Sequence, residues 1–127
     1  MRYIPLDNQP DFCKQVWNQA RQIPVAKVAT YGQIAKILGP PQGIKLEEYK
    51  EFGARWVGDA MATCPKNVPW QRVINSQGKV SKRVEAQKQQ QLLEEEGVVF
   101  VADKLDLKLY QWSGNAEEEE PNQASLF

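Results

Sequence analysis

The sequence predicts a single, mainly α-helical domain with small β elements. Its 127 residues, 42% of them hydrophobic, are enough for one core and too few for two. Apolar residues recur at helical spacing in several segments, and glycines and prolines separate those segments. We expect one folded unit over residues 1–112, followed by a disordered acidic tail over residues 113–127.

The first predicted helix begins at Pro10, a residue suited to the first helical turn. It ends at Pro24, which cannot continue a helix. One apolar stripe runs along it, formed by Phe12, Val16, Ala20 and Ile23. Residues 25–29 are too short to classify and form either a brief strand or an extended connector.

The next two predicted helices suggest a helix-turn-helix. Thr30 and Gln33 fit a capping box, which begins a helix that Gly39 and two prolines stop. Residues 42–52 form a charged insertion of uncertain structure. Residues 54–62 predict another helix, with a stripe of small residues that lets another backbone come close: Ala54, Gly58 and Ala62. The insertion makes the spacing looser than in most helix-turn-helix motifs.

The second half of the folded unit adds small β elements and one more helix. Residues 73–74 and 79–81 flank a plausible turn or small wing at residues 75–78. A helix is predicted over residues 86–96 and ends at Gly97. Residues 98–101 are all apolar, and leucines alternate with charged residues over residues 105–109. These two segments predict strands that pair as a hairpin around Asp103 and Lys104.

The composition excludes several classes of chemistry. The chain has no histidine, so a site that depends on imidazole as a base or as a metal ligand is excluded. Its two cysteines, Cys13 and Cys64, indicate neither a disulfide framework nor a zinc cluster. No segment has the length of a membrane span or the order of a secretion signal. We expect a cytoplasmic protein, associated with the nucleoid when bound to DNA, that has no cofactor or metal.

The net charge of zero conceals a segregation of charge. Four consecutive glutamates at residues 117–120 are balanced by a surplus elsewhere, where 16 basic residues face 12 acidic ones. Between Arg55 and Arg83 only Asp59 opposes the basic residues Arg55, Lys66, Arg72, Lys79, Lys82 and Arg83. Such a local surplus favours a polyanionic partner, although ordinary surface scatter produces it too.

Four segments together resemble the DNA-binding domain of O6-alkylguanine-DNA alkyltransferases, and more closely the alkyltransferase-like proteins. They are IPVAKVATYGQIAKILG, GARWVGDAM, VPWQRVINSQGKVSKR and LLEEEGVVF, in this order. The resemblance covers roughly residues 12–100 and implies a winged-helix fold. Its most specific element is a Pro-X-X-Arg core from Pro69 to Arg72, followed by Val-Ile-Asn-Ser.

The core departs from the alkyltransferases at its two reactive positions. There it reads Pro-Cys-His-Arg: the cysteine accepts the alkyl group, and the histidine helps to form the thiolate that attacks. Here Trp70 and Gln71 stand at these positions. An indole cannot accept an alkyl group by displacement and an amide cannot act as a base. The resemblance therefore implies a base-binding pocket without a nucleophile, whereas a lone tryptophan would otherwise be read as core.

The resemblance also assigns roles in flipping a nucleotide, which costs a few kcal/mol and leaves a gap to be filled. Arg55 matches the arginine that intercalates at the start of the recognition helix, and Tyr31 matches the tyrosine that crowds the 3′ phosphate. Small residues at Ala54 and Gly58 would let the helix sit deep in the minor groove. The lesion pocket would be formed by Tyr31, Trp70, Val80 and Arg83. Arg72 is also expected to be a DNA-binding residue, mainly by holding the loop in place.

Three features depart from the family pattern. The insertion at residues 42–52 is longer than the usual connector, Ala26 replaces a frequent glycine, and the acidic tail would oppose DNA. The last five residues, QASLF, resemble the peptide with which bacterial repair and replication proteins bind the sliding clamp, through Gln123, Leu126 and Phe127. An arbitrary chain end is about equally consistent with so short a match.

The leading hypothesis is a monomeric, non-enzymatic damage sensor. It would bind double-stranded DNA containing O6-alkylguanine, flip the base and present the lesion to nucleotide excision repair proteins. Two alternatives are a residual alkyltransferase that uses Cys64, and a helix-turn-helix regulator that reads an undamaged operator. The affinity for matched duplexes with guanine or O6-methylguanine distinguishes a sensor from a regulator, whereas salt dependence does not.

Overall fold

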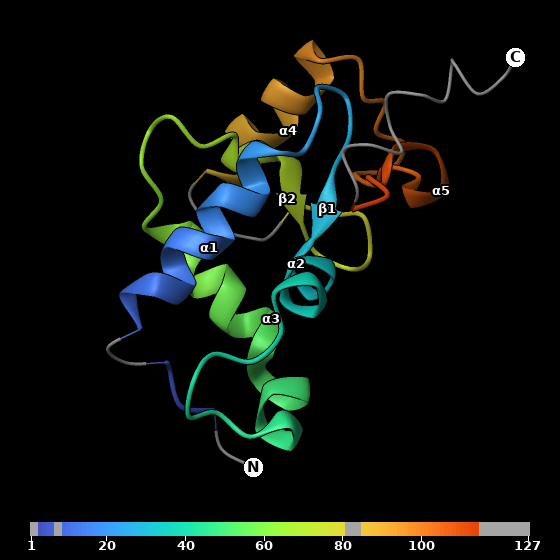
Figure 1. The fold of residues 1–127 in the computed structure, drawn as a ribbon. Coiled ribbons are helices and arrows are strands. Elements are labelled where there is room, and N and C mark those ends of the chain that lie inside the picture. Colours follow the sequence, from blue (N-terminus) through green and yellow to red (C-terminus); the bar gives the residue numbers. More distant parts are fainter. Residues whose placement is uncertain (1–2, 7–8, 81–84, 115–127) are drawn as a thin grey trace, which may run out of the picture.

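The computed structural model describes residues 3–6, 9–80 and 85–114 and is mainly helical (Figure 1). The elements in chain order are α1 (Pro10–Arg21), β1 (Ala29–Thr30), α2 (Tyr31–Leu38), α3 (Leu46–Ala62), the 3₁₀ turn η1 (Trp70–Arg72), β2 (Val73–Ile74), α4 (Ala86–Glu95) and α5 (Leu107–Tyr110). The expected mainly α fold with small β elements is confirmed. No helix within these residues combines the length and apolar character that crossing a bilayer requires.

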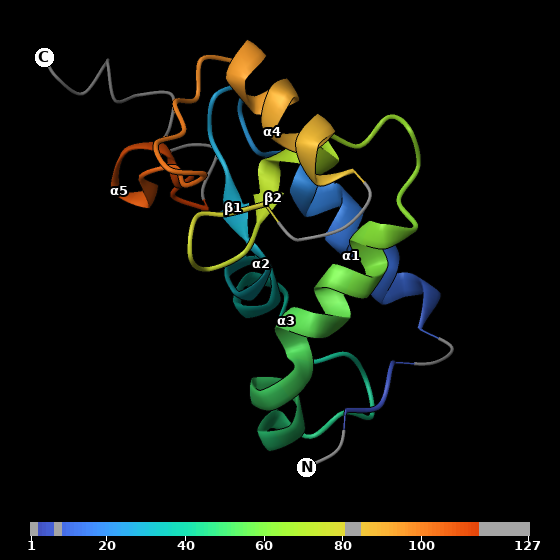
Figure 2. The same cartoon turned by 180° about the vertical axis from the view of Figure 1, so that it is seen from behind.

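Helices α1, α2 and α3 pack together around the larger of two hydrophobic clusters that the described residues form. The predicted stripe of α1 is buried, with Val16 and Ala20 fully inaccessible. A smaller cluster joins the strands to α4 and the following chain through Val28, Ile74, Leu93, Val98 and Leu105. In both views the two strands lie between α4 at one end of the molecule and α2 and α3 at the other (Figures 1 and 2).

The helix-turn-helix is formed by α2 and α3. The capping box at its start is confirmed: Thr30 Oγ1 accepts a hydrogen bond from the Gln33 amide at 3.0 Å, and Gln33 Oε1 accepts one from the Thr30 amide at 3.3 Å. Gly39 follows the last residue of α2 with a φ of 76°, a left-handed value that favours glycine.

The helix after the insertion begins eight residues earlier than residue 54, because most of the insertion is itself helical. Its apolar residues Tyr49 and Phe52 fall on one face with Trp56, and all three are buried. The Tyr49 hydroxyl donates to the Ala35 carbonyl at 2.5 Å and so ties this first part of α3 to α2. Arg55 therefore lies in the middle of α3, and its expected place at the start of the helix is wrong.

The small β elements differ from the expected wing. β1 and β2 pair in parallel, with Ala29 opposite Val73 and Thr30 opposite Ile74. The turn after β2 is present, since Gly78 donates its amide to the Asn75 carbonyl at 3.1 Å. However, residues 79 and 80 form no strand, and the Leu105 amide instead donates to the Gly78 carbonyl at 2.9 Å.

The predicted hairpin over residues 98–109 is wrong beyond its turn. Val101 and Lys104 form a single antiparallel bridge around Ala102 and Asp103, which have φ values of 53° and 64°. Residues 107–110 are the helix α5, because Asp106 caps the Lys108 amide at 2.9 Å.

Candidate nucleic-acid interface

Trp70 lines an open cavity of about 490 Å³ between the end of α3 and the start of α4. The side chain is half-buried and packs against the larger hydrophobic cluster. The described residues that line the cavity are Met61, Ala62, Cys64, Pro65, Lys66, Trp70, Glu85 and Lys88. A purely structural tryptophan would be sealed in the interior, whereas this indole is not. A planar group in the cavity can therefore reach it.

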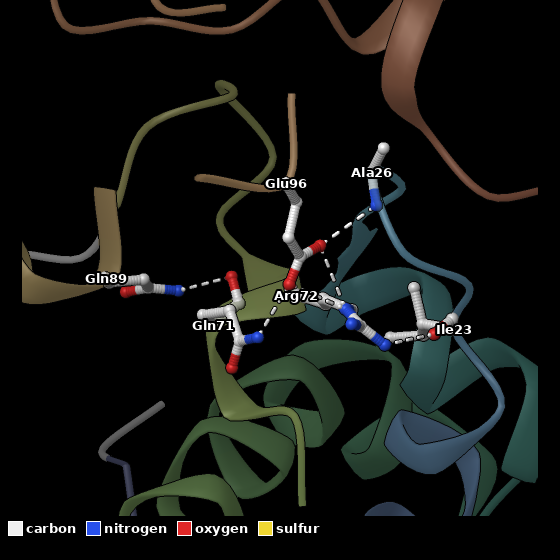
Figure 3. A network of polar contacts seen from close by, with 6 residues as sticks. All are labelled: Ile23, Ala26, Gln71, Arg72, Gln89 and Glu96. Carbon is white, nitrogen blue, oxygen red and sulfur yellow. Dashed lines mark hydrogen bonds and ion pairs between the residues drawn. The ribbon is translucent and has the colours of Figure 1, made fainter. Parts of the chain in front are cut away.

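The loop that carries Trp70 is held by Arg72 and Glu96 (Figure 3). Arg72 Nε lies 3.1 Å from both carboxylate oxygens of Glu96, and Arg72 Nη1 donates to the Ile23 carbonyl at 2.9 Å. The two side chains are only 16% and 12% exposed. Because the pair is largely removed from water and Arg72 also bonds the Ile23 carbonyl, it fixes the loop against the connector after α1. The expected loop-holding role of Arg72 is thus supported, while its contact with DNA stays a prediction.

The Glu96 carboxylate also organises two further groups. It accepts a hydrogen bond from the Ala26 amide at 2.9 Å and one from Gln71 Nε2 at 2.8 Å. Ala26 has a φ of 68°, a left-handed value that strains alanine and explains why the family frequently has glycine at this place. The hydrogen bond to Glu96 helps to hold this strained turn. Burial raises the pKa of Glu96, but the hydrogen bonds from Arg72, Ala26 and Gln71 and the positive charge of Arg72 outweigh it, so the net pKa is lowered.

Gln71, at the position of the alkyltransferase histidine, is part of this support. Its side chain is directed to Glu96, and its backbone carbonyl accepts a hydrogen bond from Gln89 Nε2 at 3.1 Å. Gln89 is fully buried and also donates to the Val73 carbonyl at 2.9 Å. An amide cannot take up a proton at neutral pH. Residue 71 therefore holds the loop and cannot generate a nucleophile.

The outer face of α3 brings together several predicted DNA-binding residues. Ala54 is exposed, and Gly58 lies beside the Tyr31 ring, whose nearest atoms would be 3.9 Å from a Cβ at residue 58. Tyr31 is half-buried at the first position of α2. Because Ala54 and Gly58 have little or no side chain, this part of α3 has the room that a close approach to a nucleic-acid backbone requires.

Arg55 is exposed on the same helix, but its guanidinium already has a stacking partner. The guanidinium carbon lies 3.7 Å from the centroid of the Tyr3 ring. Tyr3 comes from the segment before α1, and its hydroxyl donates to Asp59 Oδ2. The predicted intercalating side chain is thus at the surface in a stacked, planar arrangement.

The structure does not bring all predicted pocket residues together. Val80 lines a different hollow, of about 1000 Å³, along α4, and Lys88 is the described residue that borders both hollows. Arg83 lies outside the described residues, as do the tail residues Gln123, Leu126 and Phe127. The roles of these residues stay predictions.

Sequence reasoning missed Glu96, Gln89 and Tyr3. A usable signal existed for the first two, because Gln89, Leu93 and Glu96 are spaced by four and three residues, which places them on one side of α4 and of the capping residue that follows it. Two polar residues on the same face as a buried leucine indicate buried hydrogen bonds. No comparable signal marks Tyr3, whose partners on α3 lie 49 to 56 residues away in the sequence.

Comparison with known proteins gives consistent matches. The family model for the DNA-binding domain of 6-O-methylguanine DNA methyltransferase matches residues 11–98. The DNA base-flipping protein of Vibrio parahaemolyticus is 42% identical over 105 residues, which cover 80% of this chain and 95% of that protein. Alkyltransferase-like protein 1 of Schizosaccharomyces pombe is 39% identical over 112 residues, which cover 80% of this chain and 94% of that protein.

The fold agrees with these sequence matches. The crystal structure of S. pombe Atl1 in complex with damaged DNA containing O6-carboxymethylguanine matches with a TM-score of 0.68 at 38% identity, over 89% of this chain and 99% of that one. The short parallel sheet alone does not identify a winged-helix fold, so this assignment rests on the structural similarity. The chain belongs to the family of 6-O-methylguanine DNA methyltransferase DNA-binding domains, among its alkyltransferase-like members.

Proposed function

We propose that this protein recognises O6-alkylguanine in double-stranded DNA without repairing it. It inserts α3 into the minor groove, flips the altered nucleotide and holds the base in the Trp70 cavity. The observation that carries the proposal is the half-buried indole of Trp70 at an open cavity, in the place where the alkyltransferases have their reactive cysteine. Aromatic contact with one base contributes about 1–3 kcal/mol, enough to offset a substantial part of the cost of flipping.

The relatives support this proposal through what their names state. Proteins from Vibrio parahaemolyticus and Escherichia coli are named DNA base-flipping proteins, and the S. pombe relative was crystallised with DNA containing O6-carboxymethylguanine. Support also comes from the anchored loop. Glu96 and Arg72 hold residues 70–72 in place before DNA arrives, so little ordering of the loop is needed on binding.

The proposed roles of the α3 face follow from its geometry. Arg55 is long, exposed and planar at its end, so it can stack in the position that the flipped nucleotide vacates. Tyr31 lies next to Gly58, where a backbone phosphate would meet its ring. Ala54 and Gly58 permit the close approach. Arg83 completes the lesion pocket in this proposal, and Val80 reaches the base from the neighbouring hollow along α4.

The experiment compares the affinities of the protein for two duplexes that differ only in one base, guanine or O6-methylguanine. The proposal predicts tighter binding of the modified duplex, and it predicts that Trp70→Ala loses most of this difference. Trp17→Phe is the matched control, because Trp17 lies on α1 and donates to the Ala60 carbonyl at 2.9 Å, away from the cavity. Equal affinities of the unaltered protein for both duplexes would refute the proposal, and preference for one undamaged sequence would favour a transcriptional regulator.

A residual alkyltransferase is the second candidate, because Cys64 lines the same cavity as Trp70. In that reaction the Cys64 thiolate would attack the alkyl carbon, a carbon–sulfur bond would form, and guanine would leave from the broken oxygen–carbon bond. The chain lacks the histidine that would take up the thiol proton. Mass spectrometry after incubation with O6-methylguanine DNA distinguishes the two: an added methyl group, absent in Cys64→Ser, would establish the transfer.

The cellular context is also part of the proposal. The protein would act as a monomer in the cytoplasm, on the nucleoid when bound to DNA, and would mark the lesion for nucleotide excision repair proteins. Gln123, Leu126 and Phe127 would bind the sliding clamp. A pull-down with the clamp tests this last point, since a chain that lacks residues 123–127 should no longer be recovered.

A further inference from the structure

The segment before α1 contacts the face of α3 that carries Arg55. Phe52, Arg55, Trp56 and Asp59 are spaced by three, one and three residues, so they form one stripe of the helix. Tyr3 lies across this stripe. Its ring meets that of Phe52 edge-on, with centroids 5.4 Å apart, and its hydroxyl donates to Asp59 Oδ2. Trp56 Nε1 donates to the Ile4 carbonyl at 2.9 Å and fixes the neighbouring residue.

The guanidinium of Arg55 lies over the Tyr3 ring at 3.7 Å, so one of its two flat faces is covered. A guanidinium that fills the space of a flipped nucleotide needs both faces, because a base pair lies above it and another lies below. The contact with Tyr3 and insertion into the duplex therefore exclude each other. Arg55 must leave the tyrosine before it can enter the DNA.

We propose that Tyr3 is a parking site that holds Arg55 against α3 while the protein is not bound to a lesion. This proposal rests on the proposed function, because it takes Arg55 as the side chain that fills the space of the flipped nucleotide and Tyr3 as the group that competes with DNA for it. Tyr3 would lower the affinity for the flipped complex by the free energy of one exposed cation–π contact. That contact is equivalent to about a two- to fivefold change in affinity.

Tyr3 stays a neutral phenol over the physiological pH range. Burial, the hydrogen bond to Asp59 and the negative charge of Asp59 raise the pKa of Tyr3, and the positive charge of Arg55 lowers it by less. The hydroxyl thus stays protonated and donates to Asp59. Asp59 is exposed one helical turn after Arg55.

The test is a double-mutant cycle of Tyr3→Leu and Arg55→Ala on a duplex with one O6-methylguanine. Leucine keeps apolar bulk against Phe52 but offers no aromatic face. We expect Tyr3→Leu to bind the lesion about two- to fivefold more tightly when Arg55 is present and to have no effect when residue 55 is alanine. Tyr3→Phe keeps the ring and should stay close to the unaltered protein. Thermal unfolding checks that each variant is folded.

Three results would overturn the parking site: a Tyr3→Leu affinity equal to or weaker than that of the unaltered protein, the same gain in the Arg55→Ala background, or a gain as large for Tyr3→Phe as for Tyr3→Leu. In each case the unaltered protein would still prefer the lesion. If the unaltered protein does not distinguish O6-methylguanine from guanine, the proposed function fails first and the parking site fails with it.

Discussion

Replacing Glu96 with glutamine should destabilise the protein and loosen the loop that carries Trp70. The carboxylate accepts hydrogen bonds from three groups, the Arg72 guanidinium, the Ala26 amide and the Gln71 side chain. Glutamine has one acceptor oxygen in place of two, and its own amide group would face these donors. At least one donor would therefore lose its partner at a site where the side chains are only 16% and 12% exposed.

The expected loss is about 2–3 kcal/mol, because a hydrogen bond to a charged group contributes about 1.5–3 kcal/mol and breaking a fully buried pair costs about 3–5 kcal/mol. For a domain of this length the midpoint of thermal unfolding should fall by about 6–15 °C. The matched control is Glu95→Gln, because Glu95 is the neighbouring residue on α4 and is exposed. This control should unfold within about 0.5 kcal/mol of the unaltered protein.

The pH dependence provides a second readout with a definite sign. The pKa of Glu96 is lowered in the folded protein relative to its ordinary value of 4.5. The stabilisation that depends on its charge is therefore complete above about pH 4.5 and is lost as the pH falls through the lower, folded pKa. The difference in unfolding free energy between the unaltered protein and Glu96→Gln should narrow below pH 4.5. An unfolding midpoint unchanged by Glu96→Gln, or a deficit that is the same at pH 7 and at low pH, would refute this account of the network.

Three further outcomes follow from the structure. Ala26→Gly should raise stability by about 0.5–1 kcal/mol in denaturant unfolding, because the left-handed φ of 68° costs an alanine more than a glycine; a loss of stability would contradict the assigned strain. Gly78→Ala should lower the free energy of unfolding by about 1–3 kcal/mol in the same assay, since its Cβ would lie 2.6 Å from the Leu105 carbonyl oxygen at a φ of 77°. Gly32→Ala serves as the control, because residue 32 has open space around it. Tyr49→Phe should cost about 1 kcal/mol by removing the hydrogen bond to Ala35, and an unchanged stability would argue against that bond.

The parts of the fold that follow from local signals were predicted well. The stripe of α1, the capping box at Thr30 and the glycine after α2 each act within a few residues, so the sequence contains the whole cause. The start of α3 was not predicted because Tyr49 and Phe52 stand between charged residues, which obscure the apolar face that the two aromatic residues form. The parallel pairing of β1 with β2 was not predicted, because the two strands are more than 40 residues apart in the chain and no local pattern specifies their partner.

The candidate site shows the same division. The Pro-X-X-Arg core located Trp70, because a short motif needs no knowledge of the fold. Arg72 and its partner Glu96 are 24 residues apart in the sequence. Glu96 is the last of three consecutive glutamates, and only the orientation of α4 determines which of the three meets Arg72. The contact of Tyr3 with Arg55 depends on where the segment before α1 lies, which only the folded structure reveals.

The central claim is that the protein extrudes the altered base and holds it beside Trp70. The most direct test places a fluorescent cytosine analogue opposite O6-methylguanine and follows its emission as protein is added. If the lesion is flipped, the orphaned analogue loses its paired and stacked environment, and its emission should change in step with binding and much less with Trp70→Ala. Saturable binding of the modified duplex with no change in emission would contradict the claim.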